Sequence, residues 1–192
     1  MKFSNDTLRI AVKYWLTNPV KAVPIYGHIS SWDTSEVTDM SELFKDADSF
    51  NHHIGYWDVS NVTDMNHMFL RAKAFNRPIG NWDVSNVTNM ERMFGDAVAF
   101  NQDISNWDVS NVTDMNWMFE SAESFNQTIG NWDVSNVTDM NHMFSRAIAF
   151  NQSINNWDVS EETNILNVLY GANSYNKPLN KVGKGYWIKK TF

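Results

Sequence analysis

The stretch WDVSNVTNMERMFGDAVAFNQDISN, residues 82–106, is the unit from which most of this chain is built. Its pattern returns every 25 residues with no insertion or deletion. The clearest column is tryptophan, at Trp32, Trp57, Trp82, Trp107, Trp132 and Trp157. A strict period of this length is typical of a repeat array, in which each turn of chain stacks its residues on the equivalent residues of its neighbours. We therefore expect a solenoid.

Each repeat divides into two parts. Residues 62–72 place two Met, one Phe and one Ala at helical spacing, which predicts a short helix. Residues 75–85 hold Asn, Pro and Gly around a short apolar run, which predicts a short strand near residues 79–82 with turns on both sides. The predicted fold class is an α/β solenoid similar to leucine-rich repeats, with about six 25-residue turns, each containing one short strand and one short helix.

The two ends of the chain depart from the repeat. Leu8, Ala11, Val12 and Trp15 recur at helical spacing, which predicts an amphipathic helix that covers the open first turn of the array. The predicted organisation is a helical N-terminal cap over residues 1–28, the six-turn array over residues 29–179, and a basic C-terminal cap or tail over residues 180–192.

The composition excludes several classes of function. At 43% hydrophobic and 14% aromatic residues the chain is too apolar to be disordered, yet it holds no apolar run long enough to span a membrane. The absence of cysteine removes thiolate catalysis and Cys-ligated zinc. His67 and His142 lie three turns apart, too far to share one metal ion. Because no set of acid, base and nucleophile converges, we expect a non-enzymatic protein with no cofactor and no metal site.

Charge is distributed unevenly along the chain. Residues 164–192 carry five Lys and no acid, whereas the preceding residues carry 22 acids against 10 Lys and Arg, a balance of −12 within a net charge of −7. The acidic body disfavours nucleic acid as a partner. The basic tail is either a solvated terminus or a contact with an acidic partner, including the acidic body of another copy of the chain.

One acidic column recurs in every turn, at Asp33, Asp58, Asp83, Asp108, Asp133 and Asp158. Stacked like charges need compensation, and two explanations are open. Each carboxylate either accepts backbone N–H groups in an Asx turn or contributes to calcium binding. The turn is favoured because the loop lacks the alternating carboxylates of a calcium site.

The repeat WDVSNVTDMxxMFxxAxxFNQxIxN resembles the BspA-like repeat family, a leucine-rich-repeat-related group with about 25 residues per unit. The resemblance covers residues 29–179 and extends to the opening TLRIAVKYWL. The family occurs in bacterial surface proteins, protists and giant viruses. The resemblance implies a solenoid used for adhesion or protein contact, and it implies no shared catalytic residues.

Two features bear on localisation. The N-terminus MKFSNDTLRIAVKYWL shows no signal-peptide pattern. Glycosylation sequons at Asn61, Asn86, Asn111 and Asn136 stack in one column, where glycans could not all fit. The eukaryotic secretory pathway is therefore disfavoured, and we expect an intracellular or particle-associated protein rather than one at the cell surface.

One column of the predicted helical face changes from turn to turn: Glu42, His67, Arg92, Trp117, His142 and Asn167. Because the column is otherwise polar, Trp117 is expected to face solvent, and an exposed Trp near an Arg is typical of a protein interface. An ordinary surface Trp is the alternative. The predicted partner-binding residues are Glu42, His67, Arg92, Trp117 and His142 on this face and Lys184, Lys189 and Lys190 in the tail.

Together these features predict a non-enzymatic protein–protein interaction or assembly scaffold, one version of which is a component of a larger viral particle. The tail permits self-association with the acidic body. The alternative function is a cell-surface adhesin that binds host protein or glycan through the variable helical face.

Overall fold

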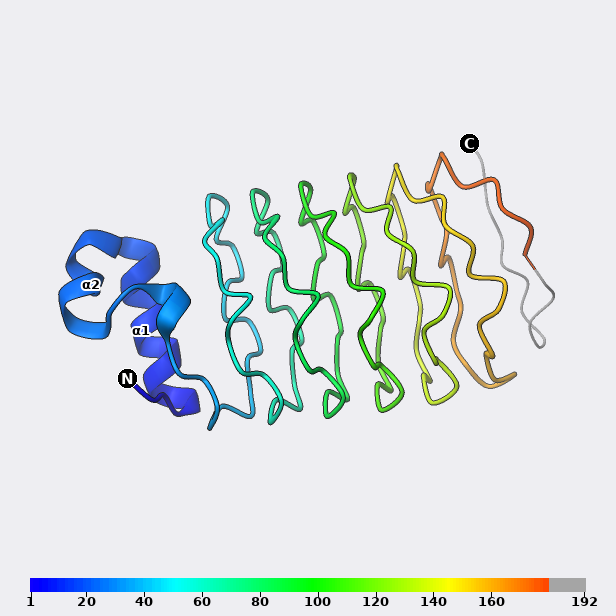
Figure 1. Ribbon diagram of the computed structural model, residues 1–192. Helices are drawn as coiled ribbons and strands as arrows, with labels where there is room; N and C mark the ends of the chain where they lie inside the picture. Colours follow the sequence, from blue (N-terminus) through cyan, green and yellow to red (C-terminus); the bar gives the residue numbers. More distant parts are fainter. Residues whose placement is uncertain (180–192) are drawn as a thin grey trace.

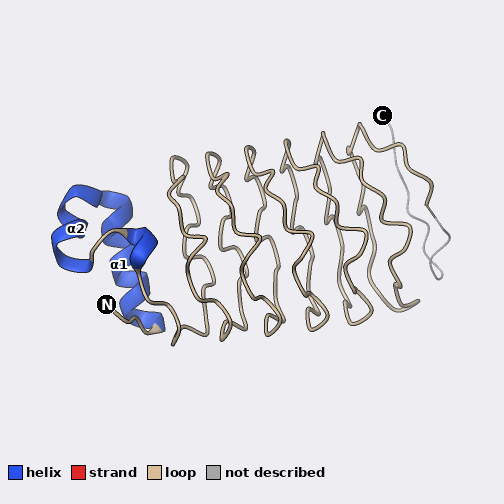
Figure 2. Cartoon of the chain, in the orientation of Figure 1, coloured by secondary structure: helices blue, strands red, loops and turns tan. Residues whose placement is uncertain are grey.

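A computed structural model describes residues 1–179 as an elongated stack of coils with two helices at its N-terminal end (Figure 1). Helix α1 spans Asn5–Thr17 and helix α2 spans Pro19–Tyr26, followed by the single 3₁₀ turn η1, Ile29–Ser31. Within the described range the coils that follow contain no helix and no strand (Figure 2). The predicted C-terminal cap, residues 180–192, lies outside the described residues.

The N-terminal segment closes the first coil. Ser4 caps α1 in a reciprocal capping box with Thr7, and the helix buries Leu8, Ala11, Val12 and Trp15. The backbone before α1 pairs with the first coil, since the N–H of Phe3 donates to the carbonyl of Asp33 at 2.9 Å. The apolar face of α1 thereby covers a core that would otherwise be open at this end.

The predicted short helix in each repeat is wrong, because residues 62–72 form a run of β-turns. The N–H groups of Met68 and Leu70 close four-residue β-turns by donating to the carbonyls of Met65 and His67 at 3.2 and 3.1 Å. The intervening N–H of Phe69 donates instead to Met93 in the next coil at 2.9 Å. Residues four apart face the core in this arrangement as they would in a helix, so the apolar spacing did not distinguish the two.

The predicted strand near residues 79–82 is also wrong. The N–H of Trp82 donates to the carbonyl of Ile79 at 3.1 Å, which closes a turn, and the coils are joined by isolated parallel bridges such as Asp64 to Asn89. Gly80 allows close contact between coils here, because a Cβ at this position would lie 2.4 Å from the carbonyl oxygen of Asp103. The array is thus a solenoid of turns rather than an α/β solenoid.

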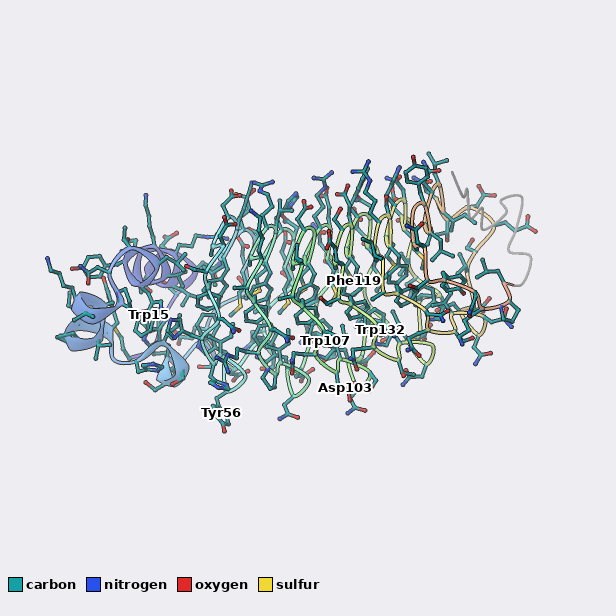
Figure 3. All side chains as sticks on the ribbon, turned by 90° about the horizontal axis from the view of Figure 1, so that it is seen from above. Trp15, Tyr56, Asp103, Trp107, Phe119 and Trp132 are labelled. Carbon is teal, nitrogen blue, oxygen red and sulfur yellow. The ribbon has the colours of Figure 1, made fainter. Side chains whose placement is uncertain are left out.

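Stacked side chains fill the interior of the array. Phe94 packs on Phe119 in the next coil with ring centroids 5.5 Å apart and planes within 7°. The indole N–H of Trp107 donates to the carbonyl of Ile79, 28 residues earlier, at 3.1 Å, and Trp57, Trp82, Trp132 and Trp157 repeat this bond. Figure 3 shows Trp107, Phe119 and Trp132 inside the stack. Aromatic stacking and buried hydrogen bonds therefore fix each coil on its neighbour.

Candidate functional site

The variable column lies on the corners of β-turns, not on a helical face. All six residues have left-handed backbone, with φ between 49° and 57°: Glu42, His67, Arg92, Trp117, His142 and Asn167. At the centre of the column the turn is closed by the N–H of Met118, which donates to Met115 at 3.2 Å. Since the coils are in register, the six side chains follow one another along the array, as the period predicted.

Three of these side chains form a layered stack. The guanidinium carbon of Arg92 lies 4.8 Å from the ring centroid of Trp117, and the imidazole of His142 lies 3.9 Å from that indole with its plane within 1°. The amide of Asn167 is in turn 3.0 Å from Nε2 of His142. We call Arg92, Trp117, His142 and Asn167 the Trp117 stack.

Trp117 faces solvent only in part. The side chain is half-buried, since contacts with Arg92 and His142 involve its indole ring. A cation beside the ring and a parallel aromatic ring each contribute on the order of 1 kcal/mol. The indole is therefore held in one orientation by residues of the neighbouring coils.

The other predicted site residues take up separate positions. Glu42 pairs with Lys45 at 2.5 Å, and this contact lowers the pKa of the Glu42 carboxyl. His67 bonds through Nδ1 to the amide oxygen of Asn66 at 2.8 Å. Both belong to the column but make these contacts within their own coils. The predicted tail residues Lys184, Lys189 and Lys190 lie outside the described residues.

A hollow of about 150 Å³ adjoins the stack. It is lined by Trp117, Glu120, His142, Ser145, Arg146 and Tyr170. The side chain of Glu120 is only 17% exposed, and burial raises its pKa even though Arg92 lies 3.8 Å away. Burial lowers the pKa of His142, and the nearby charge of Arg92 acts in the same direction. Both residues are thus shifted toward their neutral forms.

Sequence reasoning did not single out Glu120. Its column holds Lys45, Leu70, Gly95, Glu120, Ser145 and Tyr170, so Glu120 is the one acid among equivalent positions. That difference was visible in the sequence. The half-buried setting was not, because it depends on the three-dimensional position of Trp117 and Arg92.

Five of the six recurring Asp residues, those from Asp33 to Asp133, sit in Asx turns. Oδ1 of Asp108 accepts the backbone N–H of Ser110 at 3.0 Å and its hydroxyl at 2.6 Å, and Asp58, Asp83 and Asp133 repeat this pattern. The hydroxyl bond is the main reason why the pKa of Asp108 is lowered. This is the geometry expected of an Asx turn, the first of the two explanations given for the Asp column. Among residues 1–179 no three His, Asp or Glu side chains are grouped to hold a metal ion.

The chain was compared with known proteins. Residues 17–123 and 102–186 match the family described as "Mycoplasma protein of unknown function, DUF285". The chain belongs to this family. The DUF285 matches include the end of the helical cap and the whole array, and they overlap over residues 102–123 as expected for a periodic sequence. No curated protein and no solved structure matches the chain.

None of the helices in the described range is both long enough and apolar enough to cross a bilayer.

Proposed function

We propose that this DUF285 protein is a non-enzymatic protein–protein interaction scaffold, and that the Trp117 stack is part of its contact surface. The observation that carries the proposal is the ordered layer of Arg92, Trp117 and His142 on the outside of the array. Coils with Glu42 or Asn167 at the same position have the same left-handed turn, so the fold does not require an indole there.

The stack has the properties of a binding anchor. Trp and Arg dominate the binding energy of many interfaces, and side chains that are already ordered lose less conformational entropy on binding. Stacking orders Trp117 before any partner arrives. Beside it, the hollow next to Glu120 offers space for one partner side chain, while the guanidinium of Arg92 can donate to a partner carbonyl or carboxylate.

A finer part of the proposal is that the chain is a BspA-like repeat protein. The repeat WDVSNVTDMxxMFxxA supports it, and membership in DUF285 is compatible with it. Because that resemblance implies contact rather than catalysis, it supports a scaffold. One specific version of the proposed scaffold function is assembly into a larger particle. In that version the partner is another structural protein.

The experiment is affinity capture from the native source with the intact protein as bait. Wild type is compared with Arg92→Ala plus Trp117→Ala, and with a control in which Lys73→Ala and Glu123→Ala change two exposed residues of the same array. We expect a defined partner to bind wild type and control but not the double variant. Thermal melting of the three baits shows that all remain folded.

A fourth bait, with Lys184, Lys189 and Lys190 changed to Gln, tests the tail. Loss of the partner only from this bait contradicts the role of the Trp117 stack and favours assembly through the tail. Capture that is equal on all baits contradicts both contact surfaces.

A further inference from the structure

Tyr56 departs from its column without a reason in the fold. The equivalent positions in the other coils hold Ser31, Asn81, Asn106, Asn131 and Asn156. The side chain of Tyr56 is 89% exposed, and no ring of the described residues packs against it. Five coils form the same turn with a small polar residue, so the aromatic ring contributes nothing that the array requires.

The ring stands at the rim of a groove of about 430 Å³ along one long edge of the array. The groove crosses three successive coils and its lining includes Tyr56, Asn81, Gln102, Asp103 and Asn106. In Figure 3 Tyr56 and Asp103 project from the same edge. None of the groove's residues lines the hollow beside Trp117, so the two sites are separate.

The polar groups of the groove retain hydrogen-bonding capacity. Oδ1 of Asp103 accepts the N–H of Ser105 at 2.9 Å, and the Ser105 side chain also donates to this carboxylate, which has further acceptor sites for another donor. Gln102 donates through Nε2 to Asn76 at 2.7 Å, which leaves its carbonyl oxygen as an acceptor. The amides of Asn81 and Asn106 are exposed and make no hydrogen bond to the described part of the chain.

We propose that this groove binds a neutral oligosaccharide. The C–H groups on one face of a pyranose ring pack on an exposed aromatic face, and its neighbouring hydroxyls both donate and accept, as amides and a carboxylate require. A groove that crosses three coils has room for more than one sugar ring. Asp103 and the acidic body disfavour sugars that carry carboxylate or sulfate groups.

This site differs from the protein-contact surface proposed above in its residues, its edge of the array and its ligand. Its Tyr anchor has low conformational entropy, which suits a weak but selective contact with a repetitive ligand. An array that carries both sites would bind a protein through the Trp117 stack and a saccharide through the Tyr56 groove.

The test uses the whole chain and three neutral trisaccharides, cellotriose, maltotriose and N,N′,N″-triacetylchitotriose, in saturation-transfer NMR followed by calorimetry. The decisive variant is Tyr56→Asn, which introduces the residue that the four following coils already hold and therefore leaves the fold intact. Tyr56→Phe keeps the ring, and Trp117→Ala serves as the control at the other site.

We expect at least one trisaccharide to bind wild type, Tyr56→Phe and Trp117→Ala alike, and to bind Tyr56→Asn at least about 10-fold more weakly, as loss of an aromatic stack implies. Asp103→Asn is expected to weaken binding by a smaller factor. The proposal is overturned if none of the three sugars binds, or if Tyr56→Asn binds as wild type does. A protein that binds this edge in place of sugar also overturns it.

Discussion

The imidazole of His142 lies parallel to the indole of Trp117, with ring centroids 3.9 Å apart and planes within 1° of one another. Arg92 lies 4.8 Å from the centroid of the same indole. A protonated His142 would therefore add a second cation close to the first, in a half-buried setting. Side chains from three neighbouring coils meet at this place, and the neutral form of the His142 imidazole is favoured there.

Acidification is expected to destabilise the protein partly through His142. Burial lowers its pKa from the usual 6.5, so the unfolded chain binds the additional proton first. The contribution of His142 to the free energy of unfolding is therefore complete above pH 6.5. It is lost as the pH falls below 6.5 toward the folded-state pKa. His142→Gln should show a smaller loss of melting temperature between about pH 7 and 5 than wild type.

His67→Gln is the control for this measurement, since His67 occupies the same column but contacts Asn66. His52, whose pKa is also lowered mainly by burial, remains in both variants, as does Glu120 with its raised pKa. An identical pH profile for wild type and His142→Gln would mean that the stack does not disfavour the imidazolium.

Core and surface aromatic residues are expected to differ in their contribution to stability. Phe94 is fully buried and stacks on Phe69 and Phe119, so Phe94→Ala should lower the free energy of unfolding by about 3–5 kcal/mol. Trp117→Ala should lower it by only about 1–2 kcal/mol, the sum of a cation–π contact and an aromatic stack. Urea unfolding measures both. Equal losses would show that Trp117 is part of the core, contrary to its proposed role.

A glycine at a left-handed position is expected to stabilise the array. Ser121 has φ 52°, and the equivalent position in the last described coil holds Gly171 with φ 71°. Ser121→Gly relieves the left-handed strain of a Cβ and should raise stability by about 0.5–1 kcal/mol. Ser124→Gly, three residues later and not left-handed, should lower it slightly. The melting temperatures of the two variants should therefore shift in opposite directions.

The contact between coils at Gly80 is expected to tolerate no side chain. A Cβ there would meet the backbone oxygen of Asp103 at 2.4 Å, and backbone cannot move aside as a flexible side chain can. Gly80→Ala should lower the free energy of unfolding by about 1–3 kcal/mol. Ser105→Ala, in the same column, should be nearly neutral. Calorimetric melting of the pair tests this, and equal stability would place the coils further apart.

The sequence predicted the array and its register, because a 25-residue period without slippage admits only stacked coils. It did not predict the path within a coil. Apolar residues that recur three to four positions apart suit a helix. The same spacing equally suits consecutive turns in which every fourth residue is left-handed. Two residues of the final coil carried the missing signal, since Asn167 and Gly171 are the types that adopt positive φ most readily.

The candidate site was predicted in part. Column comparison singled out Trp117 and Arg92, and the structure brings them together. Trp117 is less exposed than expected because residues of one column stack on each other as well as on the core. Tyr56 was missed although it departs from its column as clearly as Trp117 does. The groove beside Tyr56 could not be predicted from its column, because the groove depends on how three successive coils stack.

Within the array, the indole N–H groups of Trp57, Trp82, Trp107, Trp132 and Trp157 each reach a carbonyl 28 residues earlier, and the backbone bridges from Asp39 to Asn164 join residues 25 apart. Every coil is therefore bound only to the coil before it and the coil after it. Duplication or excision of one whole unit by gene recombination would leave each donor facing an equivalent acceptor. Such a chain can lengthen or shorten by whole repeat units. The distance between Tyr56 and Trp117 is then set by the number of units that separate them.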